Sequence, residues 1–269
     1  MSAGSLGVPH VAYAGGRLDR VGALRKDDAW VAAALARDDA QLVPLCRDRH
    51  LVDADAEGTR AVRCTLEQLR ALDVATEEWT LLGTDDGVPV LAAELTEPDA
   101  DRVAAAMCGE WGDLRRIGPQ LRADDAALLA YARGMVIWHR RHGHCGVCGT
   151  ATERRNAGHM RQCPNPACGA ETYPRTDPAV IMLVTRELPD GTGACLLAHH
   201  GRLPAGAFST LAGFVEPGES LEEAVAREAR EEAGVRIVRA DYRGSQPWPF
   251  PSSLMIGFRA RAASRELRI

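Results

Sequence analysis

The chain has 269 residues, a formal net charge of −5 and a hydrophobic fraction of 46%, which suits two domains, or one domain and a small module. The negative charge argues against strong nonspecific binding to nucleic acid or to an anionic membrane. No signal peptide is visible in the first residues, and the longest apolar run, 179–184, is too short to cross a bilayer. We therefore expect a soluble cytoplasmic protein without a membrane partner, whose eight cysteines are thiols or metal ligands.

The first 95 residues are predicted to form a β-rich domain. Apolar segments predict strands at 41–46, 80–84 and 88–95. Asp86-Gly87 separates the last two as a hairpin turn signal, and residues 65–72 have helical spacing. No catalytic constellation is visible in this region. Three isolated cysteines are interpreted as small apolar core residues: Cys46, Cys64 and Cys108.

Residues 99–142 are predicted to be mainly helical. One helix is expected at 99–108 and a longer one from about Asp124, with Gly118-Pro119 between them. Three histidines follow at the end of this region: His139, His142 and His144. We interpret them as a polar helix end leading into a loop, because stronger metal ligands follow at once.

Those stronger ligands are four cysteines in two close pairs, each pair followed by glycine. They are Cys145 and Cys148, then Cys163 and Cys168. This pattern predicts a structural zinc site with four thiolate ligands. A closed site of this kind leaves no open position for catalysis. The second pair has the longer spacing Cys-x4-Cys, and four free thiols are the alternative.

After residue 174 the composition changes to strands around one helix. Segments 179–185 and 194–199 are predicted to form a hairpin around a loop at 189–193, and 208–213 a further strand. Cys195 is interpreted as a core residue. Ser220 and Glu223 form a capping-box pattern that begins a helix.

The predicted helix carries three glutamates on one side and ends near Gly234, a typical left-handed stop. At about 100° per residue, Glu228, Glu231 and Glu232 share one third of its circumference. Their mutual repulsion favours a bound cation, and hard oxygen ligands suit Mg²⁺ or Mn²⁺. Arg227 is expected to pair with a neighbouring glutamate. The alternative is a solvated acidic helix with a Glu223–Arg227 ion pair.

Residues 245–255 contain three prolines in alternate positions, which fix an extended path. Trp248 and Phe250 on this path suit stacking against a planar ring. The alternative is a proline-rich connection whose aromatic side chains pack on the domain.

The stretch 213–235 reads Gly-x5-Glu-x7-Arg-Glu-apolar-x-Glu-Glu-x-Gly-apolar and resembles the signature of the Nudix hydrolases. That resemblance implies hydrolysis of a nucleoside diphosphate linked to another moiety, by an α/β/α sandwich with a mixed sheet. By motif position, Glu228, Glu231 and Glu232 would bind the catalytic metal. Arg227 would orient them, and Glu219 would be a supporting carboxylate.

The ribbon cysteines, the Nudix motif and the stretch Ser-Gln-Pro-Trp-Pro-Phe-Pro, in this order, resemble the NADH pyrophosphatase subfamily. The resemblance implies an α+β homodimer with an N-terminal domain at 1–142, a zinc ribbon at 143–175 and a Nudix domain at 176–269. It implies cleavage of NAD(H) to nicotinamide mononucleotide and AMP, and removal of NAD caps from RNA. Tyr173 and Phe214 would stack on a base, one from each subunit. The expected substrate contacts are Tyr173, Phe214, Gln246, Trp248, Phe250, Ser253 and Met255.

The sequence departs from this subfamily at its end. Its members continue with a further strand and a helix that carries another glutamate near the metals, so we expect a Nudix domain incomplete at its C-terminus. Two alternatives stay open. One is a Nudix hydrolase of another dinucleotide, such as ADP-ribose or a diadenosine polyphosphate. The other is a non-catalytic regulator that binds nucleotides or RNA.

Overall fold

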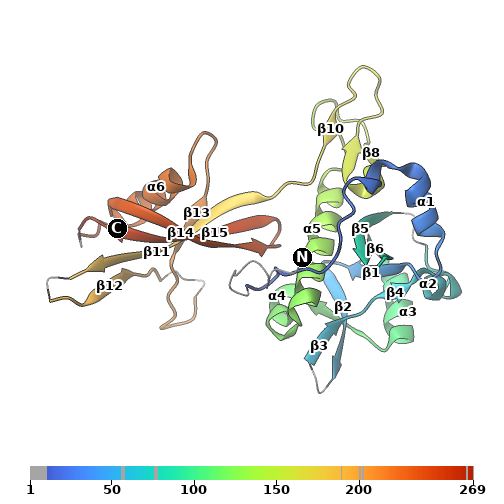
Figure 1. The fold of residues 1–269 in the computed structure, drawn as a ribbon, viewed down its shortest axis with the longest axis horizontal. Helices are drawn as coiled ribbons and strands as arrows, with labels where there is room; N and C mark the ends of the chain where they lie inside the picture. The colour runs from blue at the N-terminus through green and yellow to red at the C-terminus, as the bar shows by residue number, and fades with distance from the viewer. Residues whose placement is uncertain are drawn as a thin grey trace. The chain divides into compact units, whose positions relative to one another are not determined.

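The structure is a computed structural model that describes residues 11–55, 58–75, 78–188, 190–199, 201, 203–264 and 266–268. Its contacts divide the chain into two compact units, Met1–Arg175 and Thr176–Ile269 (Figure 1). Pro189, in the predicted hairpin loop, and residues 1–10 lie outside the described residues. No helix among the described residues is long and apolar enough to cross a membrane.

The first unit is built on a mixed sheet with the strand order β3-β2-β1-β6-β5, to which β4 and β7 are added beside β1 and β2. The strands are β1 (Gln41–Cys46), β2 (Arg49–Asp55), β3 (Gly58–Ala61), β4 (Cys64–Thr65), β5 (Trp79–Asp85), β6 (Val88–Glu94) and β7 (Glu110–Asp113). Asp86 and Gly87 both have positive φ, 48° and 81°, as the tight turn between β5 and β6 requires. The predicted β-rich region and its hairpin are confirmed.

Helices pack against this sheet and complete the first unit's core. They are α1 (Asp28–Ala36), α2 (Leu66–Ala71), α3 (Glu97–Met107), α4 (Leu114–Ile117) and α5 (Ala123–Arg141), with short 3-10 turns η2 (Leu24–Lys26) and η3 (Gly118–Gln120). The long helix α5 is buried along most of its length, including Leu129 and Ala132. The two predicted helices, from 99 and from 124, correspond to α3 and α5.

The three isolated cysteines have different environments. Cys64 is fully buried, and burial raises the pKa of its thiol to about 11. Cys46 is half-buried at the end of β1. The prediction that Cys108 is a core residue is wrong, because this residue is exposed. It is the left-handed C-cap residue of α3, with φ of 51°, where the chain turns away from the helix.

The small sheet that follows has the order β10-β9-β8. Its strands are β8 (Glu153–Arg155), β9 (Met160–Gln162) and β10 (Glu171–Thr172), with a short turn η4 (Asn156–Gly158) between the first two. Gly158 lies against β5, and an added Cβ there would be 2.7 Å from Thr80 Oγ1. A side chain at this position would push the turn away from the large sheet.

Two buried histidines join this small sheet to the rest of the first unit. His159 Nδ1 lies 3.1 Å from Arg25 Nη1, and His159 Nε2 lies 2.6 Å from Leu81 O. His139 has the same arrangement with Arg161 and the Gly158 carbonyl. Since arginine can only donate, Nδ1 accepts and the Nε2–H group donates to the carbonyl, so both rings are neutral. The interpretation of His139 as a polar helix end is wrong, because its ring is buried.

Burial lowers the pKa of His159 from 6.5 to about 4, which predicts a pH-dependent stability of the first unit. The unfolded state gains this proton near pH 6.5, whereas the folded state resists it, so stability is complete above pH 6.5 and is lost as pH falls toward 4. Urea unfolding of wild type and His159→Gln between pH 7 and 4.5 measures this effect. The wild-type dependence should be steeper, by up to about 1.4 kcal/mol per pH unit.

The exposed His199 of the second unit provides the control for this measurement. The His199→Gln variant should retain the wild-type dependence on pH. Equal slopes for wild type and His159→Gln would contradict the assignment of a neutral His159.

The second unit is a mixed sheet with the order β12-β11-β15-β14 and with β13 beside β11. The strands are β11 (Asp177–Glu187), β12 (Gly193–Leu196), β13 (Leu211–Phe214), β14 (Ile237–Trp248) and β15 (Ser253–Ala262), and the helix is α6 (Leu221–Ala233). β11 and β15 are parallel and the other pairs antiparallel. Ala224, Val225 and Ala229 of α6 pack in a core with Met182 and Phe258. The predicted mixed sheet, its hairpin and its helix are confirmed.

Two predictions about side chains and loops in this unit need correction. Cys195 is exposed on β12, at the end of the strand order, and does not belong to the core. The proline-rich stretch is extended, as predicted, but it is not a separate connection. It forms the end of the β14–β15 hairpin, in which Gln246 is opposite Met255 and Trp248 is opposite Ser253.

Candidate functional site

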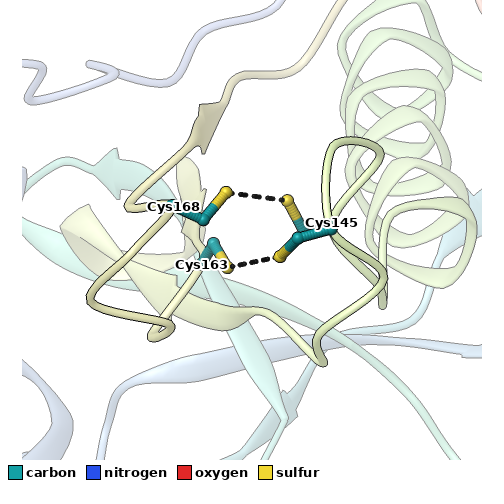
Figure 2. Close-up of side chains that lie close together, drawn as sticks. Cys145, Cys163 and Cys168 are labelled. Carbon is teal, nitrogen blue, oxygen red and sulfur yellow. Dashed lines mark hydrogen bonds between the residues drawn. The ribbon is translucent and has the colours of Figure 1, made fainter.

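The four ribbon cysteines converge on one point. Cys145 Sγ lies 3.7 Å from Cys168 Sγ, and Cys148 Sγ lies 3.5 Å from Cys163 Sγ. Four thiolates around zinc, each at a Zn–S distance of about 2.3 Å, would be separated by about 3.8 Å. Figure 2 shows Cys163 and Cys168 facing the sulfur atoms of the first pair. Within the described residues, this is the one cluster of three or more His, Cys, Asp or Glu side chains suited to a metal.

Local backbone geometry explains how both cysteine pairs close on the same point. Gly149 and Gly169 have positive φ, 78° and 61°, which lets the chain turn back directly after each pair. The longer Cys-x4-Cys spacing is accommodated by Asn165, whose carbonyl accepts from the amides of Cys168 and Gly169 at 2.9 Å. Hydrogen bonds from Thr150 lower the pKa of the Cys148 thiol to about 6, and the thiolate is the form that binds zinc. The residues present therefore fit structural zinc.

In the second unit, α6 begins and ends as the sequence predicts. Ser220 Oγ accepts from the Glu223 amide, and Glu223 Oε2 accepts from the Ser220 amide at 2.7 Å. Gly234 ends the helix in the left-handed conformation, with φ of 67°. Because Glu223 is engaged in the cap, the alternative Glu223–Arg227 ion pair is not formed.

Arg227 instead gathers carboxylates from the loop and from its own helix. Its Nε and Nη2 donate to the two oxygens of Glu219 at 2.6 and 2.9 Å. Its Nη1 donates to Glu228 at 2.8 Å and to Glu231 at 3.2 Å. Nη2 also donates to the Phe214 carbonyl at 2.8 Å. The bidentate pair lowers the pKa of Glu219 to about 2 and raises that of Arg227, so both groups are charged at neutral pH.

Glu228 lies directly over a glycine of β13. An added Cβ on Gly213 would be 1.9 Å from the Glu228 carboxylate carbon. This close approach places a carboxylate against the strand that precedes the helix. Glu232 lies outside the Arg227 network, and its pKa is raised, first by burial and then by the Glu228 charge. The three carboxylates share a helix face, but the described residues do not bring them together on one point.

The predicted aromatic contacts are divided between the two units. Phe214 is 60% exposed in the second unit, and Tyr173 is 48% exposed in the first. The Trp248 and Phe250 rings lie edge to face, with centroids 5.2 Å apart. Gln246, Ser253 and Met255 belong to the same hairpin, so the β14–β15 hairpin brings five of the seven predicted contact residues together.

Three family descriptions match successive parts of the chain. Residues 39–138 match the NADH pyrophosphatase-like rudimentary NUDIX domain. Residues 140–173 match the NADH pyrophosphatase zinc ribbon domain, and residues 175–268 match the NUDIX domain. The sequence reasoning missed the first of these, because a rudimentary domain lacks the glycine and glutamate pattern that identifies the second.

A relative from Stutzerimonas stutzeri, the NAD-capped RNA hydrolase NudC, is 43% identical over 222 residues, which are 82% of this chain and 74% of the relative. The chain belongs to the NADH pyrophosphatase family of Nudix hydrolases. Human NAD-capped RNA hydrolase NUDT12 is 46% identical over 156 residues, 56% of this chain and 33% of that protein. A solved MutT/nudix family protein from Enterococcus faecalis is 22% identical, with a TM-score of 0.34 over 38% of this chain and 42% of that one.

Proposed function

We propose that this chain hydrolyses the pyrophosphate of NAD(H) to nicotinamide mononucleotide and AMP, and removes NAD caps from RNA 5′ ends. The observation that carries the proposal is the Arg227 network, which holds Glu219, Glu228 and Glu231 behind a complete Nudix motif. The names of the bacterial and human relatives support NAD-capped RNA as a substrate.

The proposed metal ligands are Glu228, Glu231 and Glu232, and their hard oxygen atoms fit Mg²⁺ or Mn²⁺. Such an ion, when bound, neutralises pyrophosphate charge and lowers the pKa of the water that attacks phosphorus. Arg227 holds two of these carboxylates in place, and Glu219 anchors Arg227 through its bidentate pair. Catalysis is therefore mainly electrostatic and positional, as expected for phosphoryl chemistry.

We further propose that Tyr173 and Phe214 stack on a base of the substrate, one from each subunit of a homodimer. Their exposed rings, 48% and 60% accessible, support this role. The remaining proposed contacts are Gln246, Trp248, Phe250, Ser253 and Met255. The division at 1–142, 143–175 and 176–269 is supported by family matches that end at 138 and 173. Eight cysteines without a disulfide support a cytoplasmic location.

Replacing Glu232 or Glu231 by glutamine tests the metal role. Glutamine keeps the size of the side chain and removes the charge that a divalent cation needs, so we expect NADH turnover with Mg²⁺ or Mn²⁺ to fall by about 100-fold or more. The exposed Glu222 of the same helix provides the control, since Glu222→Gln should retain wild-type turnover. Turnover within tenfold of wild type for both test variants would contradict the proposed metal site.

A further inference from the structure

Tyr173 is an exposed aromatic side chain tied to a carboxylate. Its hydroxyl donates to Glu171 Oε2 at 2.6 Å, a short distance typical of a hydrogen bond to a charged acceptor. Glu171 is itself exposed, at the start of β10. The two side chains are two residues apart on extended chain and therefore share one side of it.

The Glu171 charge is not neutralised by a neighbouring cation. The described residues contain no ion pair of Glu171, whose cross-strand partner on β9 is the neutral Gln162. The next residue in the same row is Glu153 of β8, which is paired with Arg155 at 2.6 Å. The same row of the small sheet thus holds one neutralised carboxylate and one free carboxylate.

This pairing makes the Tyr173 ring a better partner for a cation than an isolated phenol. The hydrogen bond to Glu171 raises the pKa of Tyr173, because the carboxylate stabilises the protonated hydroxyl. The carboxylate charge lies at one edge of the ring and adds to the negative potential over its face. A positively charged planar ring stacked on Tyr173 is attracted by both, whereas a neutral ring gains only the stacking contact.

Of the rings in the proposed substrates, one changes charge with oxidation state. The nicotinamide ring is a cation in NAD⁺ and in an NAD cap, and it is neutral in NADH, while adenine is neutral in both. We propose that Glu171 is a specificity-determining residue that makes the Tyr173 site favour oxidised nicotinamide over the reduced form. This inference rests on the proposed function and concerns the preference between its substrates.

The test is the ratio of kcat/KM for NAD⁺ to that for NADH in wild type, Glu171→Gln and Glu153→Gln. Glutamine keeps an acceptor for the Tyr173 hydroxyl and removes the charge, so position and charge are separated. We expect Glu171→Gln to lower the ratio about three- to tenfold, mainly through KM for NAD⁺, as for charges several ångströms apart near the surface. The decrease should shrink at high ionic strength.

Glu153→Gln removes a carboxylate from the same row of the same sheet and should leave the ratio unchanged. An unchanged ratio in Glu171→Gln, or an equal loss for both substrates, would overturn the inference. If the wild-type chain cleaves neither dinucleotide, the proposed function fails. Calorimetric affinities then decide this inference separately, since tighter binding of NAD⁺ that is lost in Glu171→Gln supports it and equal affinities overturn it.

Discussion

Replacing Gly213 by alanine should lower kcat/KM for NADH by about 100-fold and leave the second unit folded. The added Cβ would be 1.9 Å from the carboxylate carbon of Glu228, so Glu228 has to move. Movement of a proposed metal ligand by about 1 Å is enough for a loss of this size. Because Glu228 also accepts from Arg227, the disturbance would extend to the other carboxylates that Arg227 holds. Steady-state kinetics and circular dichroism provide the two measurements.

Gly193 supplies a matched control for this substitution. It begins β12 in the same sheet, and an added Cβ there meets no atom within 4 Å. Gly193→Ala should therefore retain wild-type kinetics. Full activity of Gly213→Ala would show that the close approach of Glu228 to β13 is not needed for catalysis.

Replacing Cys163 by serine should remove bound zinc and destabilise the first unit by more than about 4 kcal/mol, the range typical of a lost structural metal. Cys163 is 3% exposed, and its sulfur lies 3.5 Å from Cys148 Sγ. Removal of one thiolate leaves three ligands that repel each other. Metal analysis should fall from one zinc per chain to none, and urea unfolding measures the loss of stability.

The exposed Cys108 of the same unit provides the matched control. Cys108→Ser should retain one zinc per chain and wild-type stability, because this thiol lies outside the cluster. A Cys163→Ser variant that still binds one zinc per chain would contradict the four-thiolate site.

The features that could be predicted from sequence depend on residues close together in the chain. The capping box of Ser220 and Glu223 and the left-handed Gly234 determine both ends of α6 through contacts within a few residues. The two cysteine pairs identify their cluster for the same reason, since each closes through its own turn. The hairpin at Asp86-Gly87 also follows from a local rule.

The features that could not be predicted depend on tertiary neighbours. Arg227 was expected to pair with a glutamate, but its main partner, Glu219, lies eight residues away across the loop that precedes the helix. The burial of His139 depends on the Gly158 turn of the ribbon. The exposure of Cys108 and Cys195 depends on where an element ends or lies in its sheet, which apolar composition does not specify.

The most direct test of the proposed hydrolase is product analysis of NADH incubated with this chain and Mg²⁺ or Mn²⁺. We predict AMP and reduced nicotinamide mononucleotide in equal amounts, and a 5′-monophosphate end when NAD-capped RNA replaces NADH. Parallel incubation with ADP-ribose measures the competing specificity. Intact NADH that binds without being cleaved, or release of free nicotinamide, would contradict pyrophosphate hydrolysis.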